Sequence, residues 1–328
     1  MPRAGGFVSA SIGLLSVFAL SACSEAPSDP LRLGINPWPG YGALFLAANK
    51  GFFAEEGLDI ELVELSSLSD VRRAFERGQV DGMASSLVEV LESARHSDRK
   101  PVIALITDYS NGADVVLARE GVGDIASLKG QRIGLEAGTL NQFILARALA
   151  KGGLALDDVQ IVNMPQLAMA EAVSRQEVDA VVSYPPISTD IARGGLVSEI
   201  FSSKDIPGEV ADVVSFEREI AAEHSADIDA FVRAWGRAVS FSNENPQEAH
   251  EIIGHYIGMS GSEMAEAYEG IEVISDDRQP EFLRANGPLA ASVANMTAIL
   301  WPDEDPATAV TTAAFFRSSL EPNWTGAE

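Results

Sequence analysis

Short apolar runs alternate with helical patterns from Leu31 onward, and this alternation constrains the fold more than any other feature of the chain. Apolar residues recur with period two over residues 58–65, form a continuous run at 102–107, and gather on one face of the helical segments at 41–50 and 69–77. Strand–helix alternation of this kind favours an α/β fold with parallel strands. Strands are predicted over residues 31–35, 58–65, 80–84 and 102–107, and helices over 41–50, 69–77 and 87–94.

The same order of elements begins again about 100 residues later. AFERGQVDGMAS at 74–85 and AVSRQEVDAVVS at 172–183 share Ala, Arg, Val-Asp and Ser in register. We interpret this match as a weak internal repeat, in which two lobes are built to one plan; chance similarity between two helix–strand units is the alternative. In the second unit, strands are predicted over 132–135, 159–163 and 178–183, and helices over 139–151 and 168–175.

Two apolar strands are candidates for connections between the lobes. The sequence YSNG (Tyr109–Gly112) predicts a turn, and an apolar strand follows it at 113–118. The apolar run EVADVVSF at 209–216 predicts a second crossover strand, after which helical patterns continue and would pack back onto the first lobe. The predicted organisation is a discontinuous first lobe of residues 31–112 plus 217–328 and a second lobe of residues 113–216 with the hinge strands.

The first residues have the pattern of a secretory signal. Arg3 precedes the apolar run FVSASIGLLSVFAL, which is shorter than the roughly 20 residues that a membrane-spanning helix needs. Cys23, the only cysteine of the chain, follows Leu-Ser-Ala and resembles the acylated cysteine of a bacterial lipobox; ordinary cleavage near an incidental cysteine is the alternative. We expect a signal peptide at 1–22, a lipidated tether at 23–30, and a protein anchored to a membrane in the periplasm or at the cell surface.

The charge balance disfavours two classes of partner. The chain has 48 acidic and 23 basic side chains, a formal net charge of −25. A field of this sign repels nucleic-acid phosphates and anionic lipid headgroups, so no nucleic acid is expected to bind, and membrane contact is expected only through the lipid anchor.

The sequence contains no convincing catalytic or metal-binding motif. In HEIIGH the side chains of His250 and His255 are five residues apart, so they point about 140° apart around a helix and cannot share a metal ion. Local sequence suggests no Ser–His–Asp arrangement, and Cys23 precedes the predicted fold. We therefore expect no metal, no cofactor and no catalytic residue, and the chain is not predicted to be an enzyme.

Small polar and aromatic residues follow several predicted strands. Ligands of open α/β sheets bind beyond the carboxyl ends of strands, where helix starts offer free N–H groups. Several such junctions in two facing lobes indicate a cleft. For a single junction, helix capping by Ser or Thr is the alternative, and loop aromatics such as those of NPWPGY at 36–41 can also simply fill a lobe.

Four segments resemble substrate-binding proteins of the nitrate/sulfonate/taurine class of ABC importers, which includes relatives that bind thiamine pyrimidine precursors. These segments are GINPWPGYGALFLAANKGFFAEEGLDIELVE at 34–64, RRAFERGQVDGMASS at 72–86, DIASLKGQRIGLEAGT at 124–139 and VDAVVSYPP at 178–186. The resemblance implies the two-lobed type II periplasmic-binding-protein fold, with two crossover hinge strands and a ligand cleft between lobes. It also implies a monomer that delivers a small molecule to a membrane permease and its ATPase. The ligand contacts implied by the resemblance are Trp38, Tyr41, Ser67, Ser86, Asp108, Gly138, Thr139, Asn141 and Tyr184.

Asp108 bears on the kind of ligand. It puts a carboxylate at the predicted break between lobes, which argues against nitrate or a plain sulfonate and favours an amphoteric, cationic or heterocyclic molecule. Trp38 and Tyr41 would then pack its body, Asp108 would take its positive end, and the helix start at Gly138-Thr139 would take any negative end. The alternative is that Asp108 only caps the YSNG turn.

Two other functions compete with solute delivery. A ligand-sensing module for a membrane signalling partner would have the same fold. Pyrimidine-precursor synthase chemistry, which is known on a related fold, relies on a cysteine-rich motif and an internal histidine. Since the only cysteine of this chain is Cys23, the first of these is missing.

Overall fold

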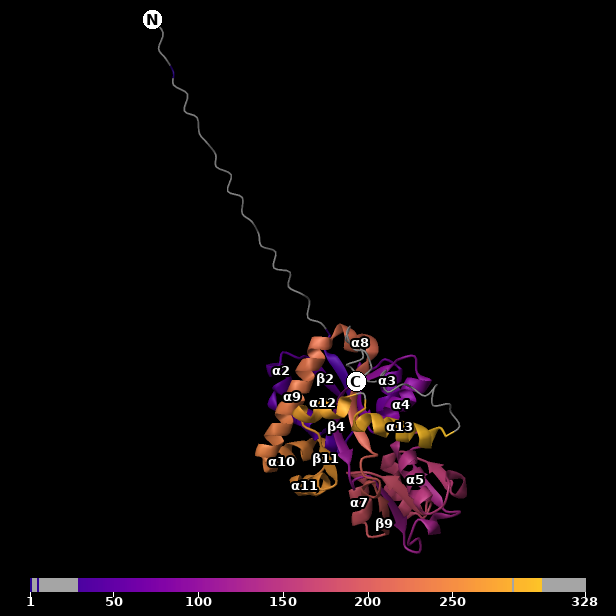
Figure 1. Ribbon diagram of the computed structural model, residues 1–328. Helices are drawn as coiled ribbons and strands as arrows, with labels where there is room; N and C mark the ends of the chain where they lie inside the picture. The colour runs from indigo at the N-terminus through magenta and orange to yellow at the C-terminus, as the bar shows by residue number, and fades with distance from the viewer. Residues whose placement is uncertain (2–4, 6–28, 285, 303–328) are drawn as a thin grey trace.

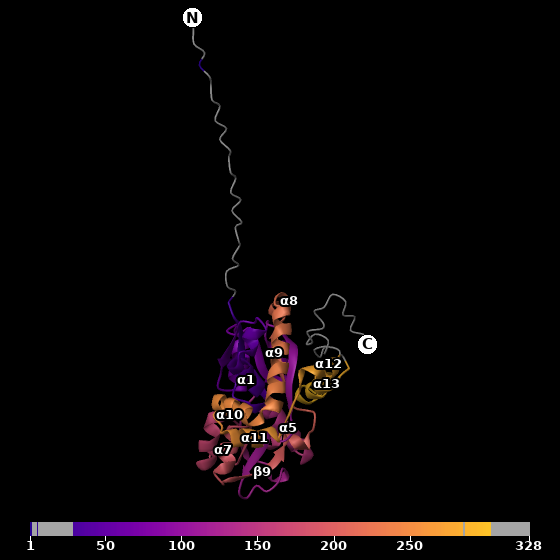
Figure 2. The ribbon, with the colours of Figure 1, turned by 90° about the vertical axis from the view of Figure 1, so that its left-hand side faces the viewer.

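Two β-sheets form the centres of two lobes in the computed structural model, which describes residues 1, 5, 29–284 and 286–302 (Figures 1 and 2). Cys23 and most of the predicted signal peptide lie outside the described residues. The first sheet has the strand order β11-β4-β10-β3-β1-β2 and the second β7-β6-β8-β5-β9. The strands of the first sheet are β1 (Leu31–Ile35), β2 (Ile60–Glu64), β3 (Gly82–Ser86), β4 (Pro101–Ser110), β10 (Ala211–Glu217) and β11 (Ile271–Val273). Those of the second are β5 (Val115–Arg119), β6 (Arg132–Leu135), β7 (Gln160–Asn163), β8 (Ala180–Ser183) and β9 (Val197–Ser202).

The two sheets share one arrangement, which explains the weak sequence repeat. In the first, β1 pairs parallel with β2 and β3, and β3 pairs antiparallel with β10. In the second, β6 pairs parallel with β7 and β8, and β8 pairs antiparallel with β5. The prediction of parallel strands is therefore correct for the βαβ units. It is wrong for β5 and β10, which enter each sheet from the other lobe and run antiparallel to their neighbours.

The chain crosses between the sheets twice, from β4 to β5 and from β9 to β10. Strand β4 continues through Tyr109 and Ser110, so the predicted YSNG turn begins two residues later than expected. The strand persists because the Ser110 N–H donates to the Val210 carbonyl, and β11 pairs with Tyr109 and Ser110 on the other side. Sequence reasoning missed β9 and β11. Each of these strands contains a charged residue, and β11 is only three residues long.

Helices cover both sheets, and those that follow β10 return to the first lobe, where α9 and α10 contact α1 (Figure 2). Helix α13 contacts α4 of the first lobe and α5 of the second, so it lies across the join between them. In the described part of the chain, no helix is both long and apolar enough to cross a membrane. The first-lobe helices are α1 (Gly42–Lys50), α2 (Phe52–Glu55), α3 (Leu68–Glu76), α4 (Leu87–His96), α8 (Arg218–Glu223), α9 (Ser225–Glu244), α10 (Pro246–Ile257), α11 (Gly261–Tyr268), α12 (Gln279–Leu283) and α13 (Pro288–Leu300). The second-lobe helices are α5 (Leu140–Lys151), α6 (Met169–Ser174) and α7 (Ile187–Arg193).

Aromatic side chains anchor the long helix α9 to the first lobe. Phe231 stacks on Phe53 with ring centroids 5.7 Å apart and meets Phe216 of β10 edge to face. Trp235 is fully buried, and its indole Nε1 donates to the Ile274 carbonyl at 3.0 Å. Rings of this size contribute much of the apolar area that a lobe buries, and the buried indole N–H has the partner that it needs.

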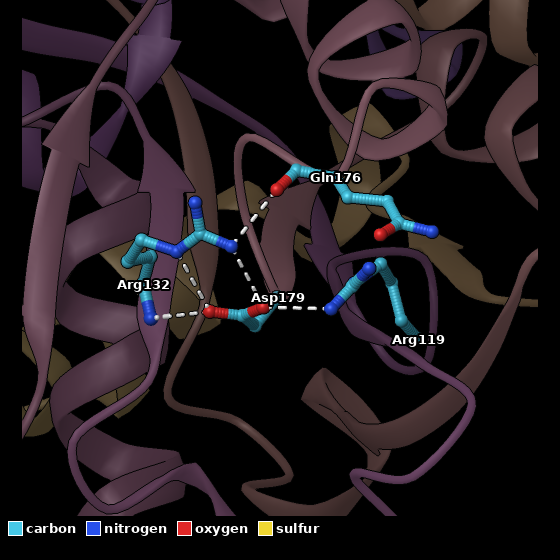
Figure 3. Close-up of polar contacts among 4 residues, drawn as sticks. All are labelled: Arg119, Arg132, Gln176 and Asp179. Atoms are coloured by element: carbon cyan, nitrogen blue, oxygen red, sulfur yellow. Dashed lines mark hydrogen bonds and ion pairs between the residues drawn. The ribbon is translucent and has the colours of Figure 1, made fainter.

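An arginine–aspartate pair recurs at the same place in each lobe. In the first lobe, the main-chain N–H and guanidinium of Arg32 on β1 donate to Asp81, just before β3. In the second, Arg132 on β6 contacts Asp179, just before β8, through the same three donors at 3.0 Å each (Figure 3). Arg119 adds a contact to Asp179 at 2.8 Å. The Val-Asp of the sequence repeat therefore holds the starts of two neighbouring parallel strands together.

We expect Asp179→Asn to lower the free energy of unfolding by about 2 kcal/mol, because the largely buried carboxylate accepts charge-assisted hydrogen bonds from two arginines. The side-chain hydrogen bond with Arg132 lowers the pKa of Asp179, so this stabilisation is present above about pH 4 and is lost as the pH falls below it. Chemical denaturation measures the change. The exposed Asp190→Asn is the control and should change stability by less than about 0.5 kcal/mol. Equal effects of the two variants would contradict the prediction.

Candidate functional site

A small cavity lies where the two lobes meet, at the carboxyl ends of the parallel strands. Residues of both lobes line it. The volume within which the centre of a water molecule can move is about 10 Å³, so the cavity has room for about one water. Any larger solute therefore requires the lobes to separate or shift. The lining residues are Asn36, Trp38, Tyr41, Leu68, Asp114, Leu140, Tyr184 and Asp212.

The loop between β1 and α1 packs against a carboxylate on β4. The Trp38 indole Nε1 lies 3.3 Å from both carboxylate oxygens of Asp108, and the Thr107 hydroxyl donates to Asp108 at 2.8 Å. Gly40 allows this close approach, because a Cβ there would lie 2.1 Å from an oxygen of Asp108. The edge of the Trp38 ring meets Tyr184 of the other lobe at a centroid distance of 5.8 Å. Asp108 thus lies behind Trp38 and already has partners.

The crossover strand β10 brings a second carboxylate beside the first. Asp212 is the direct cross-strand partner of Asp108 on β4 and of Ser86 on β3. The Tyr41 hydroxyl donates to Asp212 Oδ1 at 2.6 Å, while Asp212 Oδ2 is buried and has no hydrogen-bond partner. Like charges on directly opposed residues destabilise a sheet, so this pairing is costly unless protons or a cation neutralise it.

The first crossover contributes a third carboxylate. Asp114 lies between β4 and β5, is buried, and has an Oδ2 without a partner. Two other buried oxygens of the cavity wall, Asn36 Oδ1 and the Tyr184 hydroxyl, also lack partners. Buried polar atoms almost always have hydrogen-bond partners, so four such atoms around one cavity indicate a place for a ligand that donates hydrogen bonds.

Burial raises the pKa of four carboxyl groups around the cavity. It raises the pKa of Glu89, Asp108 and Asp114 to about 7 each, although neighbouring hydroxyls oppose the shift. Burial, reinforced by the charges of Asp108 and Asp114, raises the pKa of Asp212 well above its ordinary value. None of the residues that line the cavity is basic, so within the described chain the lining itself supplies no counter-charge.

The structure separates the nine predicted contact residues into two groups. Trp38, Tyr41 and Tyr184 line the cavity, and Asp108 adjoins it through Trp38. The rings of Trp38 and Tyr41 are both buried. The remaining five, which act in helix starts or adjacent turns, are Ser67, Ser86, Gly138, Thr139 and Asn141.

These five residues are engaged in local hydrogen bonds. Ser67, Ser86 and Thr139 accept from the N–H groups at the starts of α3, α4 and α5, as the capping alternative describes. The Gly138 N–H donates to the Gln142 side chain at 3.0 Å. The Asn141 side-chain oxygen accepts from Gln166 at 2.7 Å. A direct role of these residues in ligand binding stays a prediction.

Sequence reasoning missed Asn36, Leu68, Asp114, Leu140 and Asp212 as cavity residues. One signal was available for Asp212, because a single charged residue inside an apolar crossover strand is unusual. Asp114 similarly follows the predicted turn and precedes an apolar strand. Among the described residues no group of three or more His, Cys, Asp or Glu side chains has the arrangement of a metal site.

Two sheets joined by two crossover strands, with a polar cavity between the lobes, define the periplasmic-binding-protein-like fold. Solved structures agree: the periplasmic aliphatic sulphonate-binding protein of Escherichia coli matches with a TM-score of 0.70 at 17% identity, covering 90% of this chain and 99% of that one. The periplasmic nitrate-binding protein of Synechocystis matches with a TM-score of 0.69 at 15% identity, covering 87% and 84%. At these identities the likeness establishes the fold.

The chain belongs to the NMT1/THI5-like family, whose model matches residues 38–249. A Brucella abortus protein named only as a binding protein is 26% identical over 269 residues, which is 80% of this chain and 83% of that protein. A 4-amino-5-hydroxymethyl-2-methylpyrimidine phosphate synthase of Schizosaccharomyces pombe is 23% identical over 240 residues, 69% of this chain and 68% of the synthase. The predicted resemblance and fold class are thereby confirmed.

We expect the ligand-free lobes to open as the pH rises. Carboxyl groups with raised pKa values hold protons in the closed form up to about pH 7, whereas solvated ones lose them near pH 4. The closed form therefore binds more protons between these values, and its stability falls as the pH rises. Small-angle scattering should give a larger radius of gyration at pH 8 than at pH 5.

The double variant Asp114→Asn/Asp212→Asn is the control for this titration. It keeps the shape of both side chains but removes two of the titrating groups, so its radius should depend less on pH. A wild-type radius that is unchanged or smaller at pH 8 would show that these carboxyl groups do not govern closure.

Proposed function

We propose that this protein is the solute-binding component of an ABC importer and that it captures a small molecule with a positively charged group between its lobes. The family, the fold and structural neighbours support the role; two neighbours are named as periplasmic binding proteins, and one from Staphylococcus aureus as the ligand-binding component of an ABC-type import system. The observation that carries the ligand class is the pair of buried carboxylates, Asp114 and Asp212, each with an unpartnered oxygen at the cavity.

The charge of the cavity favours a cation over an anion. Two carboxylates in a closed, largely dry site are stable only when they are protonated or paired, and they repel an anion placed beside them. An ammonium or amidinium group supplies several N–H donors, which is what the free oxygens of Asp114, Asp212 and Asn36 require. The rings of Trp38 and Tyr184 would enclose the body of the solute.

An enzymatic role is less well supported. The synthase relatives share the family, but the only cysteine in the sequence is Cys23, and none of the residues that line the cavity is a histidine or cysteine. Solute capture accounts for the cavity without any catalytic group. A sensory role would use the same binding event and would differ in the membrane partner.

A thermal-shift screen of amines, amidines, amino acids, sulfonates and nitrate should identify a positively charged stabiliser. Asp114→Asn and Asp212→Asn should each weaken its binding by about 2–5 kcal/mol, because each removes one partner of a buried charge pair. Asp108→Asn should cost less, since Asp108 already accepts from Trp38 and Thr107. Titration calorimetry measures the three affinities.

The exposed Asp98→Asn serves as the matched control and should leave the affinity unchanged. The ligand class is wrong if nitrate or a plain sulfonate proves to be the tight ligand of the wild-type protein. It is also wrong if both Asp114→Asn and Asp212→Asn bind the identified cation as tightly as the wild type does.

We further propose that the protein is a lipoprotein that is acylated at Cys23, on the strength of the preceding Leu20-Ser21-Ala22. Acyl chains would hold the binding protein close to the permease. Cys23→Ser should move the protein from the detergent phase to the aqueous phase in a phase-partition assay. A variant that still partitions with detergent would contradict acylation at this residue.

A further inference from the structure

Glu89 stands out among the buried acidic residues because it bonds to the opposite lobe. It lies on α4 of the first lobe and is fully buried. Its Oε1 accepts the main-chain N–H of Leu140, the first residue of α5 in the second lobe, at 3.1 Å. The Ser86 hydroxyl donates to its Oε2. Leu140 also lines the interlobe cavity, so this contact lies beside the proposed solute site.

Helix capping within α4 does not explain this position. In the sequence Ser86-Leu-Val-Glu89 a glutamate three residues after the N-cap would normally accept from the N-cap main-chain N–H. The protein contains that arrangement elsewhere, since Glu263 accepts from the Ser260 N–H at 2.7 Å. In α4 the carboxylate of Glu89 instead bonds to α5 across the cleft.

The groups around Glu89 are those that bind an oxyanion. The start of the 12-residue helix α5 provides an N–H and the positive end of a helix dipole. Ser86 provides a hydroxyl. Burial raises the pKa of Glu89, and the positive charge of Arg72 on α3 opposes that rise. The Arg72 guanidinium pairs with Glu76 at 3.5 Å, and its Nη2 would lie 3.9 Å from a Cβ placed on Gly138, just before α5. The Arg72 Nε is buried and has no hydrogen-bond partner. The side chain of Glu89 therefore occupies a site that could hold the carboxylate or sulfonate group of a solute.

We propose that Glu89 is a specificity-determining residue: its carboxylate fills an oxyanion site formed by Ser86, Arg72 and the start of α5, and so excludes anionic solutes from this end of the cleft. This inference rests on the proposed solute-binding function and refines it. The neighbouring main-chain N–H groups of Gly138, Asn141 and Gln142 have partners within the protein. The side-chain Nδ2 of Asn141 is buried and has no partner.

A second buried acidic residue, Glu136, follows β6 in the second lobe. Burial raises its pKa, and the hydroxyls of Ser67 and Ser69 at the start of α3 in the first lobe oppose that rise. Its Oε2 is buried and has no hydrogen-bond partner, so the bond from Leu140 to Glu89 is the contact between the lobes on which the proposal rests.

Removing the carboxylate should convert the site into an anion site. We expect Glu89→Ala to bind acetate, methanesulfonate or nitrate saturably, at least about tenfold more tightly than the wild type, since hydrogen bonds to a charged group are among the stronger ones. Each sodium salt is titrated against sodium chloride of equal ionic strength, with the thermal midpoint and calorimetry as readouts. Glu92→Ala, which removes an acidic side chain from the same helix, is the matched control and should gain nothing.

A second substitution, at Arg72, tests where the newly bound anion lies. Adding Arg72→Gln to Glu89→Ala should abolish the new anion binding if the anion sits where the Glu89 carboxylate was. If the folded Glu89→Ala protein binds none of the three anions, or if wild type and Glu92→Ala bind them equally well, the proposal is overturned. A double variant that retains the full affinity would overturn it as well.

Removing the buried Glu89 carboxylate can also affect folding. If Glu89→Ala folds only when acetate or methanesulfonate is present, this rescue supports the proposal; if it and Glu89→Ser fail to fold in every buffer, the missing group is not an exchangeable anion and the proposal fails. Failure of the wild type to bind any cation, with normal anion gain in Glu89→Ala, would contradict the proposed function alone.

Discussion

The two crossover strands place acidic residues where the lobes close on them, and the remaining features of the site depend on this constraint. Each crossover strand lies inside a sheet and is covered on both faces, so a carboxylate that it carries cannot reach water while the lobes are closed. Asp114 precedes β5 and Asp212 lies on β10, so both connections between the lobes contribute acid to the same cavity. Both connections between the lobes therefore form part of the wall of the candidate site.

Burying several carboxyl groups together makes closure depend on what neutralises them. The protein can supply protons from solvent, hydroxyl and indole donors from its own side chains, or a bound cation. Tyr41, Trp38 and Thr107 satisfy part of Asp212 and Asp108, but Asp114 and Asp212 each keep an oxygen without a partner. Under the proposed function, closure over a positively charged solute would remove the need for protons, so solute and protons would compete to stabilise the same closed form.

The sequence predicted regular elements well where the pattern was strong. The strands at 31–35 and 132–135 have the predicted bounds, because short apolar runs mark them clearly. The prediction failed where tertiary contacts decide: Tyr109 and Ser110 have the sequence of a turn but complete β4, because β10 and β11 supply partners on both sides. The burial of Trp38 and Tyr41 likewise depends on segments that are distant in sequence, since Trp38 meets Tyr184 and Tyr41 bonds to Asp212.

The site was predictable in location and less so in charge. Helix starts and loop aromatics pointed to the carboxyl ends of the strands, and Trp38, Tyr41 and Tyr184 do line the cavity. Asp114 and Asp212 each stand out beside or within an apolar strand, but only the fold shows that both carboxylates reach the same cavity. The start of α5, which general electrostatics marks as an anion site, bonds to Glu89 because α4 of the opposite lobe packs against it. A helix start predicts where negative charge is stabilised, but only the packing of the opposite lobe decides whether the solute or the protein provides it.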